Sequence, residues 1–281
     1  MSATIEVRGV AVPSFVYGTA WKEADTARCV EDAIAVGFRA IDTANQRKHY
    51  FEAGVGEGLA RAYANGLTRD QLFLQTKFTY RRGQDQRLPY DPRASLATQV
   101  EQSFQSSLEH LRTDRIDSYV LHGPASAGRL TADDWQVWRA MERLVHAGKV
   151  RLLGISNVGL HHVQELCAGA EIPPGFVQNR CYAQTGWDRE VRLECGRRGI
   201  VYQGFSLLTA NSRIFAHPRF ARICASSNRT PAQVVFRFAQ QVGMLPLTGT
   251  TDVAHMREDL LGVDFDLGAQ DVAVIEGLLD N

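Results

Sequence analysis

Several short apolar segments of the sequence end in polar residues that could do chemistry. Asp42, Lys77 and His122 each close one such segment, and later segments end in the pairs Ser156-Asn157 and Gln178-Asn179. A carboxylate, an amine, an imidazole and amides brought together could exchange protons and hydrogen-bond a reacting group. Because burying an unpaired charge is costly, packing alone explains these positions poorly.

Each of these residues also has an ordinary structural explanation. An aspartate before a helix, such as Asp42, commonly caps that helix. Lys77 could extend its amine to solvent from a strand end, or it could act as a Schiff-base nucleophile. His122 could be a buried histidine that is bonded to the backbone. We favour one shared reactive site, because the polar residues recur at the ends of successive segments.

The composition argues against several classes of protein. The 281 residues contain 31 Lys+Arg and 31 Asp+Glu, and this balanced charge disfavours a nucleic-acid partner. No run of about 18 apolar residues indicates a membrane-spanning helix. The five cysteines are scattered, which is atypical of a disulfide framework and favours a reduced, cytoplasmic setting. His49, His161 and His162 lack partners at metal-ligand spacing, so we expect no metal.

The polar residues must be positioned by a series of short strands. After a hairpin at Thr4 to Pro13, the alternation of β-rich and amphipathic segments predicts parallel strands. The predicted strands are Phe15–Ala20, Ala40–Ala44, Leu72–Lys77, Ile116–Gly123, Val150–Asn157, Gly175–Arg180, Gly199–Ser206 and Met244–Thr250.

Helices are predicted between these strands. Apolar residues recur at helical spacing in the clearest of them, and Thr230-Pro231 is typical of a helix start. These helices are Ala94–Leu111, Asp133–Ala147, Arg189–Arg198 and Pro231–Val242. Two irregular stretches, Arg81–Arg93 and Thr209–Pro218, are long enough to be functional loops.

This order of elements predicts a single (β/α)8 barrel (an α/β TIM barrel with an N-terminal β-hairpin) over residues 1–281. An open doubly wound sheet is the alternative, but it would usually carry a GxGxxG loop, and the sequence has none. In a barrel, the carboxyl ends of the strands meet at one face. The polar residues would therefore converge there.

Several motifs, each on a predicted strand end or helix, resemble the aldo-keto reductase superfamily. Individually they are weak, but in this order they are specific, and the resemblance covers nearly the whole chain. The motifs are Gly37–Ala44, Gln75–Lys77, Ile116–His122, Gly148–Asn157, Val177–Arg180 and Met256–Leu260.

The resemblance implies a catalytic tetrad of Asp, Tyr, Lys and His. Asp42, Lys77 and His122 match it directly. The family usually places the tyrosine five residues after the aspartate, where this chain has Arg47. We expect a lengthened loop that brings Tyr50 to the same point as the general acid. Lys77 would lower the pKa of Tyr50, and His122 would orient the carbonyl.

The resemblance also implies a nicotinamide cofactor and a substrate pocket. The expected cofactor-binding residues are Gly18, Thr19, Ser156, Asn157, Gln178, Phe205, Ser206, Leu208, Gly249, Thr250, His255, Glu258 and Asp259. Strong cations are missing at the positions that usually bind the 2′-phosphate of NADPH, so NADH stays possible as the cofactor. Arg213 or Arg257 could take the place of these cations, and NADPH is favoured. The expected substrate pocket is formed by Ala20, Trp21, Tyr80 and Trp187.

The sequence thus predicts an NAD(P)H-dependent oxidoreductase that reduces an aldehyde or a ketone. Its partner would be a small carbonyl compound, without nucleic acid or membrane, and the protein would be a monomer or a weak homo-oligomer. A nicotinamide-binding sensor with little turnover is the alternative, which the displaced tyrosine favours. A Schiff-base lyase built on Lys77 is a third hypothesis, but it would leave the nicotinamide residues unexplained.

Overall fold

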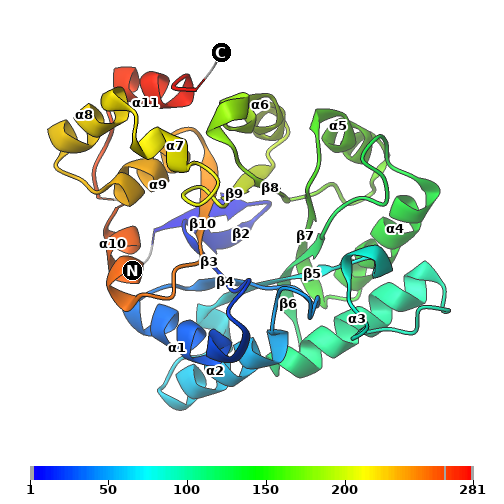
Figure 1. The fold of residues 1–281 in the computed structure, drawn as a ribbon. Helices are drawn as coiled ribbons and strands as arrows, with labels where there is room; N and C mark the ends of the chain where they lie inside the picture. The colour runs from blue at the N-terminus through cyan, green and yellow to red at the C-terminus, as the bar shows by residue number, and fades with distance from the viewer. Residues whose placement is uncertain (1–2, 263, 280–281) are drawn as a thin grey trace.

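A computed structural model describes residues 3–262 and 264–279 of the chain. The predicted domain, residues 1–281, also includes residues 1–2, 263 and 280–281, which lie outside the described residues. Eight parallel strands form a closed barrel in the order β10-β3-β4-β5-β6-β7-β8-β9 (Figure 1). The strands are β3 (Val16–Gly18), β4 (Ala40–Asp42), β5 (Phe73–Phe78), β6 (Ile116–Leu121), β7 (Val150–Ser156), β8 (Phe176–Arg180), β9 (Val201–Phe205) and β10 (Met244–Thr248).

The predicted barrel is confirmed, and every predicted strand is present, most of them in a shorter form and β5 shifted by one residue. The paired parallel strands are apolar runs that are buried on both faces. In β5 and β6, for example, every residue is buried. Most strands end sooner than predicted because their last polar residues leave the ladder, whereas β5 ends one residue later and β8 ends at Arg180 as predicted. Asp42 and Ser156 close β4 and β7, and His122 follows β6 directly.

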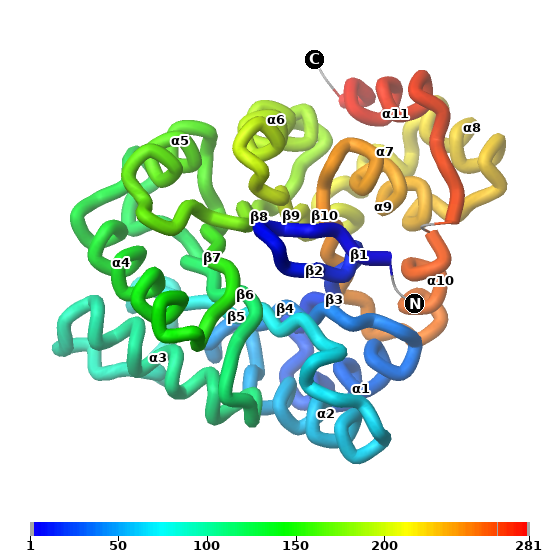
Figure 2. Tube along the Cα trace, turned by 180° about the vertical axis from the view of Figure 1, so that it is seen from behind, coloured from blue at the N-terminus to red at the C-terminus, as the bar shows by residue number. Residues whose placement is uncertain are grey.

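An antiparallel hairpin closes the amino-terminal end of the barrel. Its strands are β1 (Thr4–Val7) and β2 (Val10–Pro13), as predicted. Val7, Val10 and Val12 pack in one buried cluster with residues of the barrel strands. Figure 2 shows the hairpin across the barrel when the molecule is seen from behind. The opposite, carboxyl-terminal end is therefore the open one.

Helices form a ring around the barrel (Figure 1). The helices that connect strands include α1 (Thr26–Val36), α2 (Glu52–Ala64), α3 (Leu96–Leu111), α4 (Ala132–His146), α5 (Leu160–Gly169), α6 (Arg189–Arg197) and α9 (Pro231–Gln241), and α10 (Val253–Leu261) follows the last strand. Thr230 caps α9 as predicted, because its hydroxyl accepts a hydrogen bond from the Gln233 backbone N–H. No helix of the described chain is long and apolar enough to span a membrane.

The predicted functional loops contain short helices of their own. The 81–93 loop begins with the 3-10 turn η3 (Arg81–Gly83), and α7 (Ser212–Phe215) lies in the 209–218 loop. Further short elements are η1 (Glu23–Asp25), η2 (Arg69–Gln71), η4 (Ala183–Asp188), α8 (Pro218–Ser227) and α11 (Ala269–Glu276). Most of the loops between the strands and the next helices gather at the open end, where they surround the candidate site.

Candidate active site

A buried ion pair lies at the open end of the barrel. β4 and β5 are hydrogen-bonded neighbours, and this pairing places Lys77 beside Asp42. Lys77 Nζ is 2.7 Å from both carboxylate oxygens of Asp42 and donates to the Thr43 backbone carbonyl at 2.7 Å. Both side chains are almost completely buried. Because the amine is fully engaged as a donor, this arrangement does not favour Lys77 as a free nucleophile.

Asp42 is also the centre of a polar network across the barrel interior. Gln75 and Gln178 donate their side-chain amides to Asp42 Oδ1 at 2.7 and 3.1 Å. The same two amides donate to Gln203 Oε1 at 2.8 and 2.9 Å. β4, β5, β8 and β9 are thereby joined through buried side chains. This network explains how a barrel interior holds a carboxylate, because every added donor lowers the cost of burying its charge.

Tyr50 reaches the ion pair from the loop between β4 and α2. The loop turns at Gln46, whose carbonyl accepts from the backbone N–H groups of His49 and Tyr50. Lys77 Nζ lies 5.1 Å from the centre of the Tyr50 ring. The Tyr50 and His122 ring centres are 5.9 Å apart, edge to face. The lengthened loop therefore brings Tyr50 beside the predicted Asp, Lys and His.

Arg47, which follows Asp42 at the family's usual tyrosine spacing, points elsewhere. Its guanidinium donates to Glu23 at 2.8 Å and lies 4.6 Å from the Phe51 ring centre. It is not among the residues that line the two cavities at the barrel mouth. The inserted residues thus turn the arginine outward and the tyrosine inward.

The pKa of Tyr50 lies above its ordinary value, whereas the sequence analysis expected Lys77 to lower it. Burial raises the pKa of Tyr50, and the negative charge of Asp42 raises the pKa further. Lys77 lies over the Tyr50 ring, and its ammonium is paired with Asp42. Burial also lowers the pKa of Lys77, while Asp42 opposes that shift. Tyr50 is therefore held in its protonated, proton-donating form.

His122 is held as a neutral imidazole. Burial lowers the pKa of His122 to about 3, with smaller contributions from the charges of Lys77 and His49. Its Nδ1 forms a 2.7 Å hydrogen bond with the Thr79 hydroxyl, and its backbone carbonyl accepts from the Asn157 side-chain amide at 2.8 Å. These contacts fix the ring beside Tyr50. The sequence analysis did not identify Thr79, which lies two residues after Lys77 without any motif of its own.

A large cavity of about 770 Å³ extends from this cluster toward α10. It contains most of the predicted cofactor residues. Those lining it are Gly18, Ser156, Gln178, Phe205, Ser206, Leu208, Gly249, Thr250, His255, Glu258 and Asp259. Within the described residues, Gln178 Oε1 accepts no hydrogen bond although the side-chain nitrogen makes two. That leaves a free acceptor at the inner end of the cavity.

Two predicted cofactor residues are placed differently. Thr19 is fully buried and donates its hydroxyl to the Asp42 backbone carbonyl at 2.9 Å, so it supports the site without lining the cavity. Asn157 lines the neighbouring cavity instead of the large one. Its left-handed backbone, with φ of 58°, turns the side chain toward His122.

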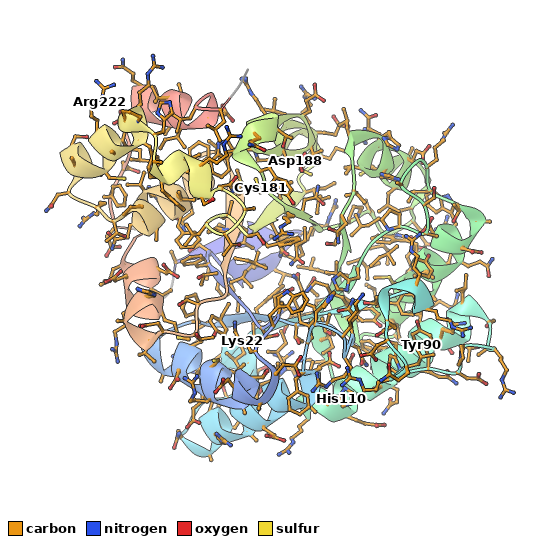
Figure 3. The ribbon with its side chains drawn as sticks, viewed as in Figure 1. Lys22, Tyr90, His110, Cys181, Asp188 and Arg222 are labelled. Carbon is orange, nitrogen blue, oxygen red and sulfur yellow. The ribbon has the colours of Figure 1, made fainter. Side chains whose placement is uncertain are left out.

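The cation in the large cavity is one that the sequence analysis missed. Lys22, labelled in Figure 3, lines the cavity and donates to the Gly249 backbone carbonyl at 2.7 Å. Burial lowers the pKa of Lys22 to about 8. Arg213 and Arg257, the predicted substitutes, do not line it. No sequence pattern marks Lys22, because its position depends on the left-handed turn at Trp21, where φ is 63°.

A second cavity of about 640 Å³ meets the first at Tyr50 and His122. Ala20, Trp21 and Tyr80 line it, as predicted for the substrate pocket. Trp187 does not, which corrects the fourth predicted wall residue. It is fully buried, its indole N–H donates to the Ile275 carbonyl at 3.0 Å, and its ring packs 5.0 Å from that of Phe238.

The described residues show no metal-binding group at this site. Within residues 3–262 and 264–279, no three His, Cys, Asp or Glu side chains form a group that could hold a metal ion. A protonated phenol, a neutral imidazole and a buried ion pair lie where the two cavities meet. This arrangement can donate a proton to a molecule in one cavity beside a second molecule in the other.

Comparison with known proteins adds an independent observation. Residues 15–280 match the model of the Aldo/keto reductase family. The chain is 31% identical to the glyoxal reductase of Bacillus subtilis over 96% of this chain and 90% of that protein. It is 28% identical to the NADPH-dependent D-xylose reductase of Meyerozyma guilliermondii over 99% and 94%. A Bombyx mori aldo-keto reductase solved with NADP superposes with a TM-score of 0.83 at 24% identity, over 99% of this chain and 93% of that one.

Proposed function

Because the chain belongs to the aldo/keto reductase family and is an oxidoreductase, we propose that it acts as a single-domain, NADPH-dependent reductase of aldehydes or ketones. The observation that carries this proposal is the meeting of two cavities at Tyr50 and His122. One cavity suits an extended cofactor and the other a small carbonyl compound. The reaction would occur where the two molecules touch.

The large cavity fits a nicotinamide cofactor on the evidence of its own residues. Gln178 Oε1, the unpaired acceptor, would receive the carboxamide N–H of the nicotinamide, and Ser156 lies beside it. Phe205 offers an aromatic face for stacking. Lys22, Thr250 and His255 would contact the anionic groups of the cofactor. When bound there, NADPH supplies the hydride for the carbonyl carbon.

Tyr50 would be the general acid. A carbonyl carbon that accepts a hydride leaves negative charge on its oxygen, and this oxygen takes the proton of the Tyr50 hydroxyl. The raised pKa of Tyr50 keeps that proton in place at neutral pH. The Lys77 ammonium, 5.1 Å from the ring centre, would stabilise the phenolate that forms. Water then returns the proton to Tyr50.

His122 would orient the carbonyl oxygen toward Tyr50. In this scheme the Thr79 hydroxyl donates to Nδ1, so the neutral ring would carry its proton on Nε2 and could donate it as a hydrogen bond to the carbonyl. A charged imidazole could not hold this tautomer, and the low pKa of His122 prevents charging at any physiological pH. Thr79 is a positioning residue in this scheme, because it acts through His122.

The test is the loss of NADPH absorbance with an activated aromatic aldehyde. We expect turnover by the wild-type protein, with weaker activity when NADH replaces NADPH. Tyr50→Phe removes the acidic hydroxyl and should lower kcat by about 10²- to 10⁴-fold. The dissociation constant of NADPH should change little, since the ring and the ion pair stay in place.

Arg47→Ala is the matched control, because Arg47 belongs to the same loop but points away from both cavities. We expect its activity to stay near that of the wild type. Full activity of Tyr50→Phe together with loss in Arg47→Ala would refute the assignment of the acid. Absence of turnover by folded wild-type protein, despite NADPH binding, would instead support a nicotinamide-binding sensor.

A further inference from the structure

We propose that the carbonyl substrate carries a carboxylate group, which Arg180 binds with help from Arg82 in the second cavity. This inference rests on the proposed reductase function and adds the class of substrate to it. It starts from the charges that line the second cavity, where two guanidinium groups occur and no carboxylate does. The positive charge of the two arginines is therefore not balanced by any residue that lines this cavity.

Arg180 is the better placed of the two cations. It is the last residue of β8 and pairs in register with Phe205 of β9, whose side chain lines both cavities. The side chain is exposed, and in the described structure its guanidinium forms no hydrogen bond and no ion pair. Its carbon lies 5.9 Å from the Tyr182 ring centre, which steadies it. All five N–H donors are therefore available to a ligand.

Arg82 is held in place and still keeps donors for a ligand. It follows β5 in η3, and its two terminal nitrogens donate to the carbonyls of Pro124 and Ala125 in the loop after β6. These bonds use two of its five N–H groups. The remaining three can reach a ligand in the second cavity. The guanidinium is thereby pre-positioned, so less conformational freedom is lost on binding.

The rest of the second cavity carries no further charge and includes several aromatic side chains. Trp21, Tyr80 and Phe205 offer apolar surfaces for the body of a small molecule. Burial lowers the pKa of His49, and the charge of Lys48 lowers it further, so this wall residue is uncharged at neutral pH. The Tyr80 hydroxyl is already committed to Asp134, to which it donates at 2.9 Å. Charge recognition is left to the arginines.

A planar guanidinium matches a carboxylate better than other ligand groups of the same charge, because two parallel N–H bonds can form. With the carbonyl held at Tyr50 and His122, such a substrate would span the cavity from its inner end to its arginine-bearing rim. The pair would also select against neutral aldehydes of the same shape. Discrimination would be expressed in KM, since the carboxylate lies away from the reacting carbon.

The experiment compares 4-carboxybenzaldehyde with 4-formylbenzamide, which have the same shape and differ in charge. We expect wild-type kcat/KM to favour the acid by about 10-fold at low salt, the effect of one charge-assisted contact. Added salt should reduce this ratio. Arg180→Met should raise KM for the acid by about 10-fold and leave the amide within a factor of about 2. Arg180→Lys should retain part of the preference.

Arg81→Met is the matched control. Arg81 is exposed beside Arg82, carries the same charge and lines neither cavity. The variant should keep the wild-type ratio. Equal kcat/KM for the two aldehydes in the wild type would overturn the proposal and leave the reductase function intact. Equal loss in Arg81→Met and Arg180→Met would overturn it as well, because only net charge would then matter.

A binding measurement separates failure of this proposal from failure of the reductase function. The dissociation constants of both aldehydes are measured by quenching of tryptophan fluorescence, since Trp21 lines the second cavity. If neither aldehyde is turned over, the reductase proposal fails. The ratio of the two dissociation constants, amide over acid, still tests the charge preference. A ratio of about 10 that Arg180→Met abolishes would support the proposal. A ratio of about one would overturn it.

Discussion

We predict that Lys22 makes cofactor binding dependent on pH, by an amount that follows from its pKa. Its side chain is only 6% exposed, and burial lowers its pKa to about 8. Nζ donates to the Gly249 carbonyl at 2.7 Å and lies 5.1 Å from the Tyr17 ring centre. No carboxylate pairs with it in the described structure. An anionic group of NADPH would therefore be its natural counter-charge, and binding would favour the protonated amine.

The size of the effect follows from the fraction of Lys22 that is protonated before binding. With a pKa of about 8, that fraction is about 0.9 at pH 7 and about 0.1 at pH 9. Above pH 8 the free protein must take up a proton in order to bind. The dissociation constant of NADPH should thus increase by about 10-fold between pH 7 and pH 9, which corresponds to about 1.4 kcal/mol.

The assay is a fluorescence titration of NADPH at fixed ionic strength, at pH 7, 8 and 9. Lys22→Arg keeps a charge that does not titrate in this range, so its dissociation constant should be nearly independent of pH. Lys22→Met should bind more weakly at pH 7, with a flat profile. A flat wild-type profile would refute the reasoning. A slope of equal size in Lys22→Met would also refute it, because another group would then be titrating.

Two further predictions concern positioning and packing. Thr79→Val removes the hydroxyl bonded to His122 Nδ1 and should lower kcat by roughly 10-fold without changing NADPH affinity, while Thr79→Ser should restore the rate; no loss in Thr79→Val would remove this role. Gly56→Ala should destabilise the protein by about 3 kcal/mol in urea unfolding, because its new Cβ would lie 1.9 Å from the His110 carbonyl oxygen. Gly196→Ala, in a helix with open space around it, is the control and should not destabilise.

Much of the barrel was predictable from the sequence, because its signals are local. Parallel strands are buried on both faces and therefore appear as short apolar runs, such as Ile116–Leu121. Their polar ends then mark the open face without any three-dimensional information. This is why Asp42, Lys77 and His122 could be grouped before their contacts were known. The boundaries were less accurate, since a strand ends where its ladder ends and not where its composition changes.

The remaining features depend on geometry that the sequence does not encode locally. Lys22 enters the large cavity through a left-handed turn, and Trp187 leaves the expected pocket because η4 turns its ring toward α9. The raised pKa of Tyr50 depends on its burial and on its position relative to Asp42, which only the folded structure shows. Arg180 belongs to a sequence motif that does not indicate ligand binding by its side chain, and the role that we propose for it depends on the absence of carboxylates from the lining of the second cavity.

The network around Asp42 has a consequence for how such a protein can evolve. Its members, including Gln75, Gln178 and Gln203, lie inside the barrel, whereas Arg82 and Trp21 belong to the loops above. Mutations at these loop residues could therefore change which molecule enters without altering the buried network beneath. A mutation in the network would leave buried amides without partners and threaten the fold itself. Selection could therefore change the substrate gradually through mutations in the loops. The residues of the network around Asp42 would have to be conserved together.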